Sequence, residues 1–541
     1  LNYYVLTSGE VNYESYERRS EEVISEQISG LPKEFEWCGP AAQKPKDLIK
    51  YIDSKTQINV INEAALSSHS LVLARNKHLN ELGDRAFELE SAPDEHGAYR
   101  VAVIGFGKTG QYAMEELYIH TARLDKKSDG YVPTQFIADV YDDDINKKSG
   151  LFAYNHPLFR CLDEKNNPIS DTSATMARAK NITGEGIEIL RSEYMEQAKA
   201  EQTKAQKFID SKMAFPVAVM HKGNCFAYPF LAAEGTETAI AAVRDYGIRD
   251  IVVALGNDER NIDMTNILID SFRRLFLKEE LADEKSDLKL KLPHVKIYVN
   301  IIDKRNKALI DWRWEKDEAL LTHKYECNAN GEITDYPRLS VIPFGYREKM
   351  YSYSPFIEDY RERLYNYGYN LRTAINDANE QDKPLVQQNY DQFKASVAKD
   401  YNAYKSNEDA IDQWMTISQF LRLSNKSAQA FSINYYKYKK LHAGEFSAAD
   451  WDYLVRLEHE RWNRFFISHG WVYAKYYKDD KYKTMSDEDK KEEKKKEKDA
   501  RRQVRQHNCL CPFDVMLDDY TKAYDRGNVE LGFIKEIVFG E

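Results

Sequence analysis

A short apolar run that ends in three closely spaced glycines constrains the fold of this chain most. Residues 99–104 read Tyr-Arg-Val-Ala-Val-Ile, and Gly105, Gly107 and Gly110 follow with the spacing G-x-G-x-x-G. A helical pattern comes next. Gly105 permits a sharp turn, Gly107 lets the backbone approach a pyrophosphate, and Gly110 lets the helix pack closely on the strand. The order of strand, glycine turn and helix therefore predicts a nucleotide-binding turn.

The remaining residues of the turn, Phe106, Lys108 and Thr109, belong to the same candidate site. Backbone N–H groups at the start of the helix and the helix dipole favour a negatively charged ligand there. We expect NAD(H) or a related adenine nucleotide at residues 105–110. An ATPase P-loop ending at Lys108-Thr109 is excluded, because it would need a glycine at Ala102, inside the predicted strand.

Sequence patterning divides the chain into four segments. Residues 1–95 show a β-α-β-α pattern without a glycine turn, which indicates a partial Rossmann-like unit. In residues 98–345 apolar strands alternate with helices, which predicts an α/β fold with a Rossmann-type parallel sheet. Residues 346–445 are expected to be a helical connector. Residues 446–541 are expected to be a small, mainly helical domain with a charged, solvated insert at 478–505.

Composition excludes several classes of function. The chain has 541 residues and a net charge of −11, which argues against general nucleic-acid binding. Its six cysteines show no paired C-x-x-C spacing, so we expect reduced thiols, no metal site and a cytoplasmic protein. We find no signal peptide and no apolar run long enough to span a bilayer. Because the chain begins at Leu1 rather than Met, the question whether a membrane segment precedes it stays open.

The second predicted strand, residues 136–141, ends in a cluster of acids. A carboxylate at this position can accept hydrogen bonds from ribose hydroxyls, and we assign that role first to Asp142 and second to Asp139. The separation from the glycines exceeds the usual ~20 residues because of a loop at 125–133. The alternative is an exposed acidic turn.

The end of the fourth predicted strand carries a family resemblance. Residues 254–261 read Ala-Leu-Gly-Asn-Asp-Glu-Arg-Asn. Together with the glycine turn and the acid-ended second strand, this segment resembles the TrkA-type nucleotide-binding domains of the regulator-of-potassium-conductance (RCK) family, over about residues 98–310. The resemblance implies a domain that senses NAD(H), ADP or a related nucleotide and changes the state of an associated pore. It adds Asn257, Asp258 and Asn261 to the cofactor site. The long insert between the second and third strands departs from the family pattern.

A second resemblance lies in the C-terminal segment. Its motifs are Leu-Glu-His-Glu-Arg-Trp at 457–462, Gly-Trp-Val-Tyr at 470–473, His-Asn-Cys-Leu-Cys-Pro-Phe at 507–513 and Tyr-Asp-Arg at 524–526. In this order they resemble the ryanodine-receptor repeat (RyR) domain. The resemblance implies a ligand pocket formed by Glu458, His459, Arg461, Trp462, Trp471, Tyr473, His507 and Pro512.

The residues of this pocket allow two interpretations, one functional and one structural. Glu458 and Trp462 share one helix face at spacing i, i+4, which would suit an aromatic slot with a charged rim. No nucleophile or metal-ligand spacing accompanies His459, so acid–base chemistry is not indicated. Alternatively, Trp462 and Trp471 are core aromatics and His459 is a hydrogen-bonded structural residue.

Together the two resemblances imply a nucleotide-sensing regulatory or effector protein. Bacterial proteins with this pairing resemble sensors in nucleotide-signalled antiviral defence or soluble parts of gated ion channels. The same resemblance implies a homo-oligomer, a small signalling nucleotide as ligand and a membrane channel as partner. Two alternatives stay open: an NAD-dependent oxidoreductase, for which no Tyr-x-x-x-Lys or Lys/His/Asp constellation is found, and a non-catalytic interaction scaffold.

Overall fold

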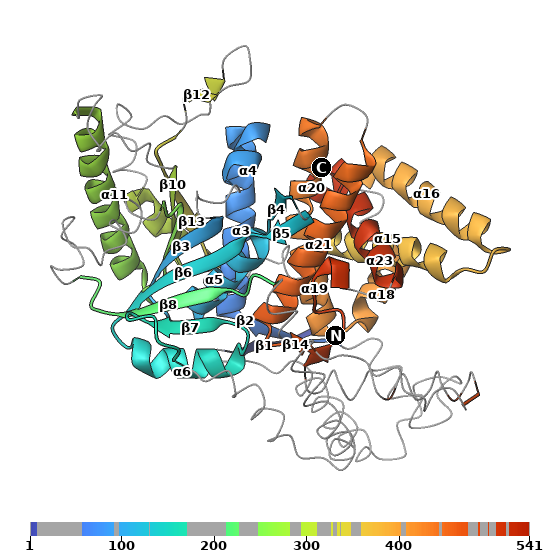
Figure 1. Ribbon diagram of the computed structural model, residues 1–541, viewed down its shortest axis with the longest axis horizontal. Coiled ribbons are helices and arrows are strands. Elements are labelled where there is room, and N and C mark those ends of the chain that lie inside the picture. Colours follow the sequence, from blue (N-terminus) through green and yellow to red (C-terminus); the bar gives the residue numbers. More distant parts are fainter. Residues whose placement is uncertain are drawn as a thin grey trace.

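The structure is a computed structural model (Figure 1). It describes residues 2–7, 57–90, 97–128, 130–169, 213–226, 247–281, 294–310, 326–327, 333–335, 337–347, 359–401, 407–442, 446–473, 485–486, 489, 496, 505–515 and 519–539. The sequence also has helical patterns near residues 13–29, 184–211 and 234–246. These residues lie outside the described part of the chain, as does most of the charged insert at 478–505.

A central sheet of seven strands forms one half of the molecule. In spatial order its strands are β13 (Leu339–Phe344), β10 (Val295–Asn300), β9 (Asp250–Val253), β3 (Ala98–Ile104), β6 (Gln135–Asp142), β8 (Val217–Lys222) and β7 (Arg160–Asp163). Every neighbouring pair runs parallel. The expected α/β class with a Rossmann-like parallel sheet is confirmed.

The order of the strands places a topological switch point beside β3. The chain passes from β3 to β6 and β8 on one side, then returns to β9 and β10 on the other side. In open α/β sheets, ligands bind in the crevice at the carboxyl ends of the strands where the order reverses. That crevice lies between the ends of β3 and β9.

Two layers of helices cover the sheet. On one face lie α3 (Glu63–Leu82) and α5 (Lys108–His120), and on the other lies α11 (Asp258–Leu281). The alternation of β3 side chains explains this arrangement, since Val103 packs in the same core as Leu117 of α5, whereas Ala102 packs in the core that holds Leu268 of α11. Strands buried on both faces require the continuous apolar runs from which they were predicted.

The N-terminal unit forms a separate small sheet. β1 (Asn2–Thr7) pairs in parallel with β2 (Gln57–Asn62), and α3 and α4 (Asp84–Glu90) follow. The two predicted strands and the second predicted helix are therefore present. α3 packs on α5 and β13, so this unit lies against the central sheet.

Helices from both sides of residue 445 form one helical body, which lies beside the sheet in Figure 1. They are α15 (Tyr360–Asp377), α16 (Lys383–Lys399), α18 (Glu408–Thr416), α19 (Gln419–Phe431), α20 (Ile433–Leu441), α21 (Ala448–Ser468), α23 (Asp519–Leu531) and α24 (Lys535–Phe539). Leu364 of α15 and Phe393 of α16 share a core with Leu531 and Ile537. A shared hydrophobic core thus crosses the boundary expected at 445/446.

Arg464 of α21 fastens the helical body to the sheet. Its fully buried guanidinium donates to the carbonyl oxygens of Tyr118 at 3.0 Å and Thr134 at 2.6 Å, and it pairs with Glu460 at 2.7 Å. Tyr118 lies in the last turn of α5 and Thr134 directly precedes β6. The amino edge of the sheet is therefore bonded directly to α21.

Several short elements complete the described structure. They are α6 (Ile145–Asn155), the hairpin of β4 (Leu124–Lys127) and β5 (Gly130–Pro133), the antiparallel pair β11 (Glu326–Cys327) and β12 (Ile333–Asp335), and the parallel pair β14 (Val472–Tyr473) and β15 (Gln506–His507). The sequence predicted a loop at 125–133, where the structure has the β4–β5 hairpin. Among the described residues, no helix is both long and apolar enough to cross a membrane.

Candidate functional site

Two of the three turn glycines are required by close backbone contacts. Gly105 has φ +96° and its N–H donates to the carbonyl oxygen of Tyr141 at 2.9 Å. A Cβ atom on Gly105 would lie 2.3 Å from the carbonyl oxygen of Ala254, and one on Gly110 would lie 2.0 Å from the carbonyl oxygen of Gly105. The absence of a side chain at Gly105 and Gly110 therefore lets the backbones at the end of β3, after β9 and in α5 pack closely together.

Gly107 is different, because a Cβ atom added there would meet nothing within 4 Å. The residue has φ −70° and ψ −177°, a conformation open to any residue, and it caps the N-terminus of α5. Neither the backbone conformation nor packing within the described chain requires a glycine at this position, although glycine is a favourable N-cap residue. A close approach of an external group to the backbone would require it, as in dinucleotide-binding turns.

Asp142 closes the side of the turn that faces β6. Its carboxylate accepts hydrogen bonds from the N–H groups of Phe106 at 2.7 Å and Asp144 at 2.8 Å, and it pairs with Lys148 at 2.7 Å. Burial by itself raises the pKa of the Asp142 carboxyl, but Lys148 and the two N–H groups lower it below its ordinary value. Asp142, the residue predicted to accept hydrogen bonds from a ribose, thus lies at the turn. Its carboxylate is already paired with Lys148, and a ribose hydroxyl would have to displace that lysine.

We expect Asp142→Asn to lower the free energy of unfolding by about 1–2 kcal/mol near pH 7, because the charge-assisted bonds are lost. The folded-state pKa lies below the ordinary value of 3.8. The carboxylate therefore stabilises the fold above about pH 3.8, and this contribution fades as the pH falls through the lowered pKa. Urea unfolding should show the two proteins converging in stability at acid pH. Asp144→Asn, at an exposed carboxylate, is the matched control and should change stability by less than about 0.5 kcal/mol. An Asp142→Asn deficit that persists unchanged at acid pH would contradict this assignment.

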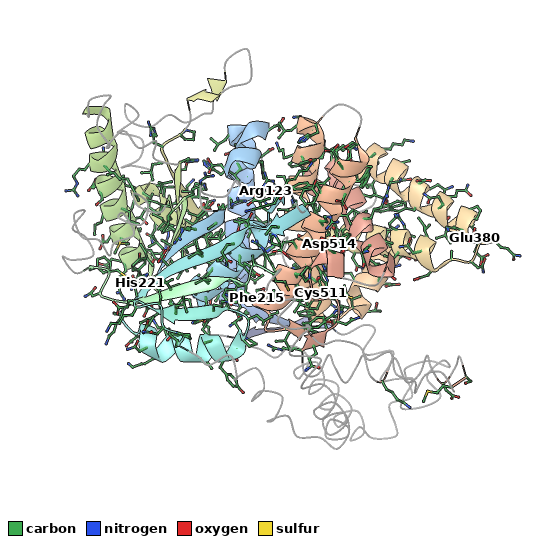
Figure 2. All side chains as sticks on the ribbon, viewed as in Figure 1. Arg123, Phe215, His221, Glu380, Cys511 and Asp514 are labelled. Carbon is green, nitrogen blue, oxygen red and sulfur yellow. The ribbon has the colours of Figure 1, made fainter. Side chains whose placement is uncertain are left out.

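Asp139 lies apart from Asp142. The two residues are three positions apart on β6, so their side chains point to opposite faces of the sheet. One oxygen of Asp139 lies 2.9 Å from Nε2 of His221, and the other is buried without a hydrogen bond among the described residues. His221 stacks on Tyr141 and lies on the side of the sheet away from the helical body (Figure 2). The structure does not bring the two predicted carboxylates together.

The predicted residues after β9 shape the other side of the crevice. Asn257 accepts from the N–H of Arg260 at 2.9 Å at the start of α11. Asn261 is fully buried, accepts from the N–H of Leu255 at 2.6 Å and donates to the carbonyl oxygen of Asn300 at 2.7 Å. These side chains fix the loop that packs against Gly105.

Asp258 has a similar supporting position. Its carboxylate accepts from the N–H groups of Ile302 at 2.7 Å and Asp303 at 2.9 Å, and from the Asn306 amide at 2.7 Å. It ties the start of α11 to the segment after β10. The motif that resembles the TrkA-type family therefore lies at the crevice, but the side-chain oxygens of Asn257, Asp258 and Asn261 accept hydrogen bonds from within the chain.

The charged residues of the RyR-like pocket are buried inside the helical body. Glu458 is fully buried and accepts from Arg461 through two bonds of 2.7 Å, from the Tyr435 hydroxyl at 2.5 Å and from the Asn528 amide at 2.8 Å. His459 is 1% exposed, and its ring nitrogens lie 3.1 Å from Asp525 and 2.8 Å from the carbonyl oxygen of Cys511. These contacts match the structural interpretation of His459.

The aromatic residues of that pocket lie together at the border with the sheet. The Trp462 ring lies 4.1 Å from Phe466 and 4.9 Å from His507 between centroids, and Trp471 stacks on Phe420 at 5.4 Å. Trp471 is buried, whereas Trp462, Tyr473, His507 and Pro512 are partly exposed. The structure gathers the aromatic residues of the predicted pocket, and His459 stacks on Trp462 with ring centroids 5.9 Å apart, whereas Glu458 and Arg461 pair with each other inside the helical body.

Sequence reasoning missed a buried ionic cluster at the amino edge of the sheet. Lys296 of β10 pairs with Glu90 and with Asp250, and Asp250 accepts from the Tyr99 hydroxyl. Burial alone raises the pKa of Glu90, but Lys296 and His294 hold it well below its ordinary range. Lys296 interrupts an apolar strand, which is the sequence signal that could have revealed the cluster. In the described part of the chain, no group of three or more His, Cys, Asp or Glu side chains is arranged to hold a metal ion.

No family model matches this sequence, and neither a curated protein nor a solved structure matches it. The two family resemblances therefore stay predictions.

Proposed function

We propose that this protein binds an adenine nucleotide, NAD(H) or a close relative, at the glycine turn and acts as a nucleotide-sensing regulatory or effector protein. The contrast among the three glycines carries the proposal. Gly105 and Gly110 are pressed against backbone atoms, whereas Gly107 faces open space at the switch point of the sheet. The N–H groups at the start of α5 then bind the phosphates, with the helix dipole adding to the attraction.

A regulatory role is supported by α5, because this helix connects the glycine turn to the helical body. This helix has 13 residues and so spans about 20 Å between the turn and the amino edge of the sheet. Its last turn is bonded to Arg464 of the helical body through the carbonyl oxygen of Tyr118. A nucleotide that fits one arrangement of the turn better than another shifts the population of that arrangement by its difference in affinity.

The RyR-like motifs suggest that the helical body carries the part of the sensor that responds to nucleotide binding. We propose that residues 446–541 offer a ligand or partner surface, in a homo-oligomer or beside a channel, in nucleotide-signalled defence or ion-channel control. The partly exposed rings of Trp462, Tyr473 and His507 support a surface of this kind, since aromatic side chains are enriched at ligand and protein interfaces.

A nucleotide panel tests the proposal against its alternatives. We expect NADH, NAD⁺ or ADP to raise the melting temperature of the purified protein, because a ligand that binds only the folded state stabilises it by about 2.7 kcal/mol at one hundred times its Kd. NADH absorbance should stay constant over time. Steady NADH oxidation with an added carbonyl compound would favour an oxidoreductase, and no shift with any nucleotide would favour a scaffold.

A further inference from the structure

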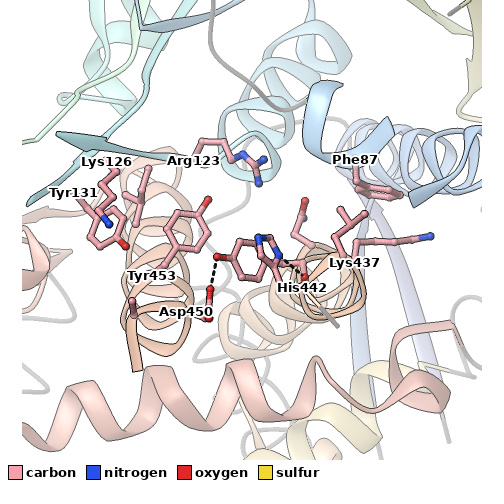
Figure 3. Close-up of a pocket in the computed structure, with 13 residues that line it drawn as sticks. Phe87, Arg123, Lys126, Tyr131, Lys437, His442, Asp450 and Tyr453 are labelled. Carbon is pink, nitrogen blue, oxygen red and sulfur yellow. Dashed lines mark hydrogen bonds between the residues drawn. The ribbon is translucent and has the colours of Figure 1, made fainter. Parts of the chain in front are cut away.

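A pocket of about 360 Å³ lies where the sheet meets the helical body, at the opposite end of α5 from the glycine turn. Arg123 and Lys126 line it from the segment after α5 and from β4, and Tyr131 lines it from β5. The other wall comes from α20 and α21, with Lys437 and Tyr453. Two parts of the fold that are distant in sequence therefore build one cavity (Figure 3).

The walls of this pocket are rich in aromatic rings. Tyr438 stacks on Tyr453 with centroids 5.1 Å apart, and Tyr131 lies 5.6 Å from Tyr453 in a tilted arrangement. Tyr438 also stacks on His442, with ring centroids 4.0 Å apart. Rings gathered in this way offer both apolar faces and hydroxyl groups to a planar ligand.

The charge of the pocket is positive, although the whole chain is acidic. Three cationic side chains line it, those of Arg123, Lys126 and Lys437, against one carboxylate, Asp450. Because Asp84 balances the charge of Lys437, the positive charge open to a ligand comes from Arg123 and Lys126. Asp450 is occupied in the capping box of α21, where it accepts from the N–H of the N-cap residue Ser447 at 2.9 Å, and it also accepts from the Tyr438 hydroxyl at 2.9 Å. In a chain with a net charge of −11, a local excess of cations in a cleft attracts a small anion.

The cations differ in how firmly they are held. Lys437 is buried, pairs with Asp84 at 2.6 Å and lies over the Phe87 ring, so it forms a fixed wall. Lys126 is exposed, and its ammonium group forms no ion pair or hydrogen bond with another described residue. In Figure 3, Arg123 lies on the sheet side of the pocket and the Tyr453 hydroxyl points toward its guanidinium.

We propose that this junction pocket is a second binding site, for a mononucleotide-sized anion that carries an aromatic ring. The rings and hydroxyls of the tyrosines take the planar part of the ligand, and Arg123 with Lys126 takes its phosphate. The volume lies at the lower end of the roughly 300–1,000 Å³ typical of small-ligand pockets, which suits a ligand the size of one nucleotide. Because the site lies at the far end of α5, it does not rest on the function proposed for the glycine turn.

Calorimetric titration of Gly107→Asp protein tests this site without interference from the glycine turn. The probes are AMP, GMP, CMP and UMP, with the four matching nucleosides as the ring without the charge and inorganic phosphate as the charge without the ring. We expect at least one mononucleotide to bind, and its nucleoside and inorganic phosphate to bind at least about tenfold more weakly, since either one leaves half of the pocket's contacts unmade.

Variants of the β4–β5 hairpin localise the binding. Lys126→Ala should weaken the mononucleotide about tenfold, which corresponds to roughly 1.4 kcal/mol. Lys127→Ala is the matched control, because Lys127 is the next residue, equally exposed, and does not line the pocket. Tyr131→Leu should also weaken binding, with the fold checked by circular dichroism. The proposal is overturned if no mononucleotide binds, or if Lys126→Ala and Lys127→Ala bind with equal affinity.

Discussion

Replacing Arg461 with methionine should lower the free energy of unfolding by about 3–5 kcal/mol, because it leaves the fully buried Glu458 carboxylate without its cation. Two bonds of 2.7 Å join the pair inside the helical body. Tyr435 and Asn528 also donate to this carboxylate, but neither of them carries a positive charge. The loss should appear as a lower urea midpoint in circular dichroism.

Two further variants separate the destabilisation caused by an unpaired Glu458 carboxylate from the general effect of removing an arginine. Arg456→Met removes an arginine of the same helix whose partners, Asp452 and Asp514, are exposed, so it should cost less than about 1 kcal/mol. The double variant Glu458→Gln with Arg461→Met should recover much of the lost stability, since it removes the unpaired charge. A stable Arg461→Met protein that had lost a ligand would instead support the pocket implied by the RyR resemblance.

Gly110→Ala is expected to destabilise the protein by about 3 kcal/mol, because its Cβ atom would lie 2.0 Å from the carbonyl oxygen of Gly105. That oxygen belongs to the backbone, so relief of the clash requires α5 to move away from β3. Gly150→Ala is the matched control, since Gly150 lies in α6 and a Cβ atom there meets nothing within 4 Å. It should stabilise the protein by up to about 1 kcal/mol through helix propensity. Equal thermal stability of the two variants would contradict the close contact at the turn.

The central sheet could be predicted because its strands are short, apolar runs between helical patterns. Residues 295–300 and 251–253 are buried throughout, which is what a parallel sheet covered on both faces requires. The β4–β5 hairpin was not predicted, because Leu124–Lys127 is mostly charged and its strand is only four residues long. The junction pocket that this hairpin helps to form was therefore missed as well.

The glycine turn could be predicted from local spacing, but the roles of its neighbours could not. Asp142 was placed at the site by its position at a strand end, yet its pairing with Lys148 depends on how α6 packs. Asn261 belongs to a recognisable motif, but only tertiary contacts show that its amide bridges Leu255 and Asn300. Side chains that serve the loop and side chains that meet a ligand look alike in a sequence.

Titration of NADH into the Gly107→Asp protein shows whether the glycine turn binds a nucleotide. The new carboxylate would place negative charge where the phosphates bind, while Gly107 has space for a side chain, so the fold should be kept. The matched control is Gly150→Asp, which adds the same charge to an exposed helix position. Calorimetry should show NADH binding to the wild type and to Gly150→Asp, and binding weakened at least about a hundredfold, or roughly 2.8 kcal/mol, in Gly107→Asp. Equal affinity in all three proteins, with circular dichroism unchanged, would contradict a nucleotide site at the glycine turn.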